Sequence, residues 1–164
     1  MASRGFHWLL TLTAGFEGLR AGAGTLRMVL DLPARTEIGA VAFAQFSRAT
    51  DLSAVGVPFY IVYGAGGALL TLTTWIVALR SDVSREKKLL TGLAALCSVL
   101  ILVLTTQAAP LMFAVGSSPD DPALLANLLD DFVRWTNWRI GLADLSFVGV
   151  LLALAAQSRY GSAG

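Results

Sequence analysis

The sequence predicts an all-α integral membrane protein: a four-helix bundle with a short extra helix on the outer side between the first and second spans. Of its 164 residues, 55% are hydrophobic and only 14% are charged, whereas a soluble domain carries about 25% charged residues. Mean hydropathy is +0.68. Several apolar runs reach the about 20 residues that a span needs, and an open sheet would leave its edge groups unpaired in lipid. We therefore expect one membrane domain over residues 1–164, with the lipid bilayer as its main surroundings.

Four spans are expected, at about residues 5–31, 55–79, 89–115 and 122–157. The second and third contain no charged residue, and the apolar part of the fourth contains only Asp144. The first run, which begins "GFHWLLTLTAGFEG", has the length of a signal peptide, but Glu17 interrupts it and we expect it to be retained as a span.

The connections between spans set the orientation. Residues 81–88, "SDVSREKK", contain both lysines of the chain, and Arg4 and Arg159 lie near its two ends. Because Lys and Arg favour cytoplasmic loops, we expect a multi-pass protein of the cell membrane with both termini cytoplasmic. The net charge of +1 gives no indication of a nucleic-acid partner.

The two remaining connections are then on the outer side. In the first, Thr36 is a plausible N-cap, and apolar residues at helical spacing follow it, which predicts a short helix over 36–49. In the second, "GSSPDDP", Asp121 and Pro122 have the character of a cap and first turn, and predict the start of the last helix there.

Polar residues in the first and last spans form two stripes. At 100° per residue, positions 13, 17, 20, 24, 27 and 31 fall within about 80° of one another, and positions 127, 130, 134, 137, 141 and 144 within about 100°. Each charged side chain that faces lipid inside a membrane costs about 2.5 kcal/mol or more. We therefore expect the stripes to face each other. By spacing, Glu17 can pair with Arg20 and Arg27 with Asp31. Asp31 and Asp144 are the favoured partners of the two arginines.

This convergence predicts a polar pocket between the first and fourth helices, opening outward and roofed by the outer helix. Glu17 and Asp144 are the candidate catalytic residues. The candidate ligand-binding residues are Arg20, Arg27, Asp31, Gln45, Arg48, Asn137 and Arg139. The number of arginines favours an anionic ligand or one that becomes anionic. The alternative is that these charges only pair with each other and hold the bundle together.

The sequence offers little for a metal or cofactor. His7 is the only histidine and Cys97 the only cysteine, too few for a haem pair, a two-histidine metal site or a Ser-His-Asp triad. No phosphate-binding loop or GxGxxG pattern occurs. We expect neither a metal nor a cofactor.

Residues 132–156, "FVRWTNWRIGLADLSFVGVLLALAA", resemble the DUF1772 group of four-span membrane proteins, which includes anthrone-oxygenase-like proteins. Trp135, Asn137 and Arg139 match the residue types with which that family enters its last span. "DLSAVGVPFY" and "TTQAAP" are also similar in layout. The resemblance implies an oxidoreductase: a cofactor-independent oxygenase acting on a flat, apolar aromatic.

Such chemistry needs a base and a cation that holds the resulting oxyanion. Asp144 or Glu17 is the expected base, and Arg20, Arg27 or Arg139 the expected cation. The alternative function is a non-catalytic subunit or lipid-binding accessory protein of a larger membrane complex, with a membrane protein or a second copy of the chain as its partner. A small transporter is less favoured, because four spans without a repeat are poorly suited to alternating access.

Overall fold

The chain is helical throughout the part that the structure, a computed structural model, describes: residues 2–161, with side chains from 4 to 156. Its elements are α1 (Ala2–Leu26), a π-helical segment η1 (Arg27–Asp31), α2 (Leu32–Ile38), α3 (Ala40–Ala49), α4 (Gly56–Arg80), α5 (Arg85–Ser117) and α6 (Pro122–Gly161). The all-helical prediction is confirmed. The helices α4, α5 and α6 are long and apolar enough to cross a membrane, which is the character of a membrane protein.

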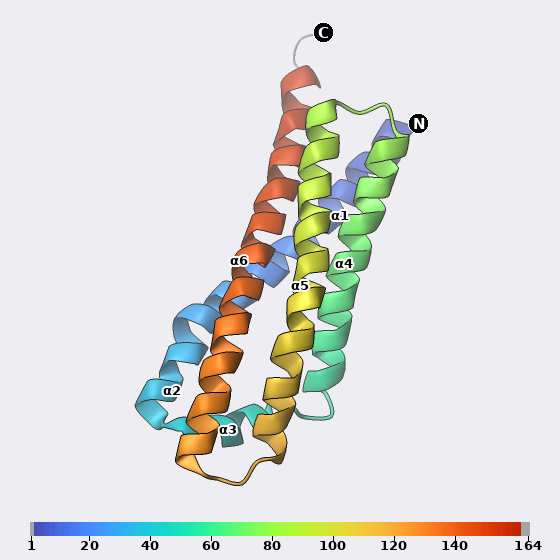
Figure 1. Cartoon of the computed structure of the whole chain (residues 1–164). Coiled ribbons are helices and arrows are strands. Elements are labelled where there is room, and N and C mark those ends of the chain that lie inside the picture. Colours follow the sequence, from blue (N-terminus) through green and yellow to red (C-terminus); the bar gives the residue numbers. More distant parts are fainter. Residues whose placement is uncertain (1, 162–164) are drawn as a thin grey trace.

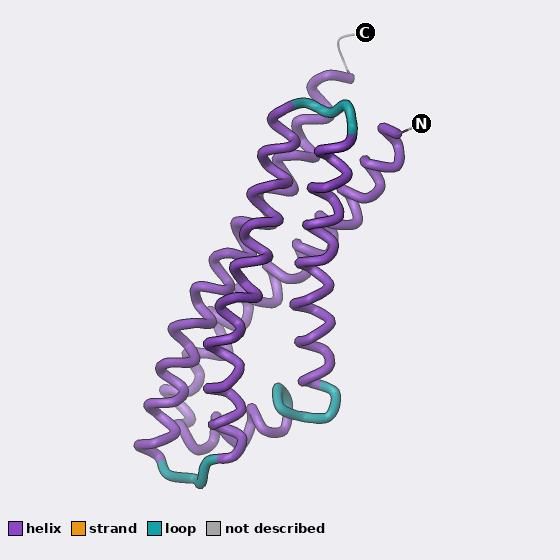
Figure 2. Tube along the Cα trace, turned by 45° about the vertical axis from the view of Figure 1, so that its right-hand side comes forward, coloured by secondary structure: helices purple, strands orange, loops and turns teal. Residues whose placement is uncertain are grey.

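Helices α4, α5 and α6 run side by side, and α1 slants across behind them (Figure 1). Helix α6 packs against α5 and α1, and α4 packs against the same two helices from the other side. Both ends of the chain lie at one end of the molecule, together with the loop that joins α4 to α5 (Figure 2). The short helices α2 and α3 and the loop between α5 and α6 lie at the opposite end.

Local capping explains where the last two long helices begin. At the start of α5, the side chain of Ser84 accepts a hydrogen bond from the Lys87 backbone N–H. At the start of α6, Asp121 Oδ1 accepts the backbone N–H of Ala123 at 2.9 Å, and Pro122 occupies the first helical position. The side-chain bond satisfies one of the donors that a helix start leaves unpaired. The predicted cap at Asp121 is therefore confirmed.

The connection between α1 and α4 differs from its prediction. The expected helix over 36–49 is two helices, because Gly39 adopts a φ of 85° between α2 and α3, a conformation that favours glycine. Thr36 is not an N-cap: it lies within α2, and its hydroxyl bonds to the carbonyl of Pro33 at 2.7 Å. Gly39 itself precedes the first residue of α3.

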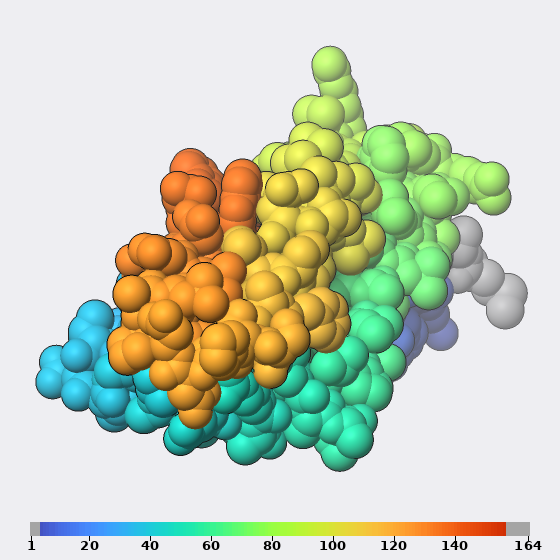
Figure 3. Space-filling model, turned by 60° about the horizontal axis from the view of Figure 1, so that its bottom comes forward, coloured from blue at the N-terminus to red at the C-terminus, as the bar shows by residue number. Residues whose placement is uncertain are grey.

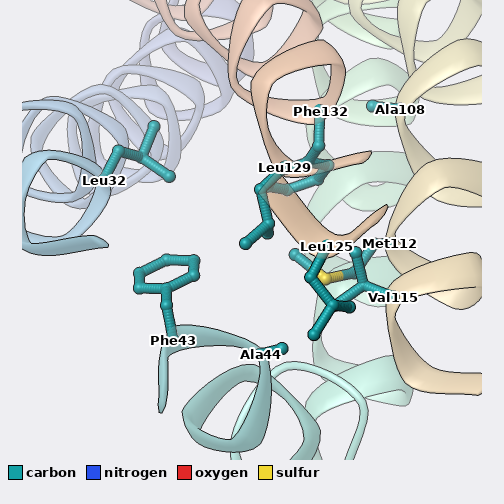
Figure 4. Packing of buried hydrophobic residues seen from close by; sticks show 9 residues of the cluster. All are labelled: Leu32, Phe43, Ala44, Ala108, Met112, Val115, Leu125, Leu129 and Phe132. Carbon is teal, nitrogen blue, oxygen red and sulfur yellow. The ribbon is translucent and has the colours of Figure 1, made fainter. Parts of the chain in front are cut away.

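Two apolar clusters fill the ends of the bundle. Figure 4 shows the cluster where α2, α3, α5 and α6 meet, which consists of Leu32, Phe43, Ala44, Ala108, Met112, Val115, Leu125, Leu129 and Phe132. The other cluster lies nearer the chain termini and consists of Phe6, Leu10, Ala14, Ala78, Ala94, Val150 and Ala153. Between the two, the bundle contains charged and hydroxyl side chains.

Candidate functional site

Helix α1 buries an ion pair in the middle of the bundle. Arg20 Nη1 lies 2.7 Å from Glu17 Oε1, and the two side chains are 3% and 0% exposed. The pairing is as predicted from their spacing of three residues. The second carboxylate oxygen, Glu17 Oε2, is buried without a hydrogen-bond partner. A buried ion pair of this kind adds little stability by itself, but removing one partner leaves an uncompensated charge.

Three other helices shape the space around Arg20. Ser98 on α5 accepts a hydrogen bond from Arg20 Nη1 at 3.3 Å, and Ser98 and Ser146 of α6 lie 3.5 Å apart, Oγ to Oγ. On α4, Tyr63 donates its hydroxyl to the Arg20 carbonyl at 2.9 Å. Gly67 leaves room for the guanidinium, since a Cβ there would lie 2.1 Å from Arg20 Nη1. The site is therefore built from all four long helices.

Arg27 is held by Asp51, a carboxylate that was not the predicted partner. The predicted partner was Asp31, but Asp31 is exposed, and Arg27 instead contacts both carboxylate oxygens of Asp51, Nη1 to Oδ1 at 2.9 Å. Tyr60 accepts a hydrogen bond from Arg27 Nη1 at 2.6 Å and donates its hydroxyl to Asp51 Oδ1 at 2.9 Å. The ring of Phe132 lies 5.9 Å from the guanidinium carbon.

The predicted pair lies at the two ends of a π-helical segment, since η1 begins at Arg27 and ends at Asp31. Asp31 is exposed, and Arg27 bonds to Asp51 instead. Single π-helical turns inside α-helices often mark functional sites.

The polar stripe of α6 does not face that of α1, which corrects the sequence prediction. Asn137 and Arg134 are exposed, as are Asn127, Asp130 and Gly141. Asp130 instead pairs with Arg35 of α2. Arg139, about 160° from Asn137 around the helix, is half-buried, and its Nε is buried without a hydrogen-bond partner.

Asp144 is the one member of the α6 stripe that reaches α1. Thr25 donates its hydroxyl to Asp144 Oδ1 at 3.2 Å. This contact lies in an open groove of about 610 Å³ between α1 and α6, lined by Gly18, Ala21, Gly22, Thr25, Leu26, Val29, Leu30, Asp144 and Phe147. The groove lies between the two helices for which the sequence predicts a pocket, and Asp144 is its only charged lining residue.

The predicted roof over this pocket is wrong. Gln45 and Arg48 of α3 do not line the groove; both bond to Asp120 in the loop before α6, at 3.0 and 2.6 Å. Arg48 also donates to the carbonyls of Val115 and Ser118 at the end of α5. Figure 3 looks onto this end of the molecule, where α3 lies beside the start of α6. The hydrogen bond from Arg48, with a second from Gln45, lowers the pKa of Asp120.

The candidate residues therefore fall into three places. The interior or its border contains Glu17, Arg20, Arg27 and Arg139. The groove contains Asp144. Neither place includes Asp31, Gln45, Arg48 or Asn137. The sequence places Asp51 and Tyr60 among the polar residues of the outer end, but the list of candidate site residues omitted them and Ser98, which follow no helical stripe. Among the described residues, no three His, Cys, Asp or Glu side chains are grouped so that they could hold a metal ion.

No family model, no curated protein and no solved structure matches this chain.

Proposed function

We propose that the protein spans the membrane four times, with α1 as a fourth span beside α4, α5 and α6. A helix of 25 residues is about 37 Å long, which exceeds the about 30 Å of hydrocarbon in a bilayer. Its charges Glu17 and Arg20 are buried in the protein. Its outer face carries Leu12, Leu19 and Leu26, each more than half exposed. A helix with this distribution suits lipid on one side and protein on the other.

The proposed orientation keeps both termini in the cytoplasm. Lys87 and Lys88 lie at the end of the bundle that holds the chain termini (Figure 2), and cytoplasmic ends of membrane proteins are enriched in Lys and Arg. This orientation places α2 and α3 on the outer side of the cell membrane.

Within that frame, we propose that the protein binds a small, apolar molecule with an acidic or hydrogen-bond-donating group. The observation that carries this proposal is the groove between α1 and α6. Its volume, about 610 Å³, is large enough for a small molecule, and because the groove is open, protein would cover such a molecule on one side. Its walls are apolar except at Thr25 and Asp144. An apolar wall with one carboxylate selects a ligand that brings a proton donor to that point.

The arrangement favours binding over catalysis. An oxygenase of the kind that the DUF1772 resemblance implies would form an anion on its substrate, and that anion needs a nearby cation. Asp144 is a suitable base for the first step, but no arginine lines the groove, and Glu17 is buried in its pair with Arg20. The oxygenase therefore remains a prediction, which oxygen uptake with an aromatic C–H acid would test.

The binding proposal can be tested by filling the groove. A Cβ at Gly22 would meet no atom within 4 Å, so Gly22→Leu occupies the groove without disturbing the fold. The matched control is Gly15→Leu, because Gly15 is also exposed and free of contacts on α1 but does not line the groove. The probe is anthrone, a flat aromatic C–H acid, titrated into lipid nanodiscs that contain the protein, with empty nanodiscs as the blank.

We expect Gly22→Leu and Asp144→Asn to weaken anthrone binding at least tenfold, and Gly15→Leu to bind like the unaltered protein. Equal binding by Gly22→Leu and Gly15→Leu would remove the groove from consideration. If the unaltered protein binds no anthrone above the blank, the proposed class of ligand is wrong. Obligate co-purification with another membrane protein would favour the subunit alternative instead.

A further inference from the structure

Arg139 is a cation without an anion in the interior of the bundle. It is half-buried on α6, its Nε is buried and makes no hydrogen bond, and no carboxylate among the described residues lies within ion-pairing distance of it. The acids that share its region are already engaged. Glu17 pairs with Arg20, and Asp51 pairs with Arg27.

The charged groups nearest to Arg139 do not supply the missing negative charge. Arg27 and Arg20 carry the same positive charge as Arg139 and lie near enough to act on it. Counting the three arginines and the two paired acids, the cluster carries one net positive charge. Asp144 does not offset it, because a separation of five residues places it about 140° away around α6, where it accepts the hydroxyl of Thr25.

An unpaired guanidinium in the interior of a membrane protein is costly. We propose that Arg139, whose guanidinium supplies the one unpaired positive charge of this cluster, binds an oxyanion. The planar guanidinium presents donors in a fork that fits phosphate and carboxylate oxygens. The oxyanion is either the phosphate of an anionic phospholipid or a free anion such as inorganic phosphate. This site is separate from the groove, because Arg139 does not line it.

The test measures thermal unfolding in a neutral maltoside detergent. One arm adds inorganic phosphate, against sodium chloride of the same ionic strength. The other adds phosphatidylglycerol, against phosphatidylcholine. The variants are Arg139→Met and the matched control Arg134→Met, which removes the same charge from the same helix. The Arg134 side chain is 64% exposed and pairs only along the helix, with Asp131.

We expect one of the two anions to raise the unfolding temperature of the unaltered protein and of Arg134→Met. In Arg139→Met, the anion concentration for half of that rise should increase at least tenfold. A response to phosphatidylglycerol alone identifies a lipid headgroup, and a response to inorganic phosphate as well identifies a free-anion site. Without added anion, Arg139→Met should be more stable than the unaltered protein, because it removes an uncompensated charge.

Two results would overturn the proposal. One is an equal response of Arg139→Met and Arg134→Met to both anions. The other needs no variant: an unaltered protein that responds to neither anion beyond its salt or phosphatidylcholine control has no such site. The second result keeps the proposal testable if Arg139→Met does not fold.

Discussion

Replacing Gly67 by alanine should expose how tightly the buried ion pair is held. Gly67 is buried on α4 against the Arg20 side chain, and a Cβ added there would lie 2.1 Å from Nη1, 2.6 Å from Cζ and 2.8 Å from Cδ. Real atoms do not approach so closely, so either α4 or the guanidinium must move. The same Nη1 donates to Glu17 and to Ser98, and both bonds are lost if the guanidinium is displaced.

The expected cost follows from these contacts. Breaking a buried ion pair while one charge stays behind costs about 3–5 kcal/mol. Alanine recovers up to about 1 kcal/mol through its better helix propensity. We therefore expect Gly67→Ala to lower the free energy of unfolding by about 2–4 kcal/mol, the difference of these two terms.

The control is one residue away. At Gly66 an added Cβ would meet only the ring of Phe16, Cζ at 3.4 Å and Cε2 at 4.0 Å. These are ordinary contacts, so Gly66→Ala should be neutral or slightly stabilising. Both variants are compared by unfolding of the folded protein in detergent. The same comparison is then repeated in a Glu17→Gln, Arg20→Met background, where the cost at Gly67 should largely disappear. A cost equal to that of Gly66→Ala, or one that persists unchanged in this background, would refute the reasoning.

Two further predictions concern the end of the bundle near α3. Asp51→Asn weakens the charged hydrogen bonds that hold Arg27 and should lower the free energy of unfolding by about 1.5–3 kcal/mol. Its control, Asp31→Asn at an exposed position, should change that free energy by less than about 0.5 kcal/mol. Similar costs for the two variants would contradict Asp51 as the partner of Arg27. Arg48 lowers the pKa of Asp120 below its ordinary 3.8, so this contact stabilises the fold above that pH and the stabilisation is lost as the pH falls through the lowered pKa. Unfolding temperatures measured from pH 6 to pH 3 should therefore fall less for Asp120→Asn than for the unaltered protein, and parallel curves would count against it.

The long helices could be predicted because their apolar runs are long and their ends carry recognisable signals. The expected starts and ends of α4, α5 and α6 lie within about four residues of those observed, and Asp121 caps α6 as expected. Gly39 was the missed signal: it separates α2 from α3, but an isolated glycine in a helical pattern is compatible with either continuation or a break.

The side of each helix that faces inward was harder to predict than the bounds of the helices. A helical wheel groups polar residues on one arc, but it does not say whether that arc meets protein, lipid or water. On α1 the arc that contains Glu17 and Arg20 is buried. On α6 the corresponding arc around Asn137 is exposed, and the half-buried Arg139 lies outside that arc.

Length supplies the physical reason. The part of α6 whose side chains are described, Pro122–Ala156, has 35 residues and is about 52 Å long, well beyond the about 30 Å of a hydrocarbon core. Its first turns can therefore extend past the membrane, where exposed polar residues such as Asp130 meet water or pair with Arg35 of α2. The assumption that every polar residue of a span must face protein fails for a helix this long.

The two proposed sites share α6 but carry opposite charge. Asp144 faces the apolar groove beside α1, and Arg139 lies about 140° away around the helix, outside that groove. The two residues cannot neutralise each other, so each has to be compensated separately: Asp144 by Thr25 and a proton donor on a ligand, Arg139 by an oxyanion. If that is correct, Gly22→Leu should reduce anthrone binding without changing the response to phosphate or phosphatidylglycerol, and Arg139→Met should do the reverse. A loss of both responses in either variant would mean that one ligand occupies both places, with its acidic group at Arg139 and its apolar body in the groove.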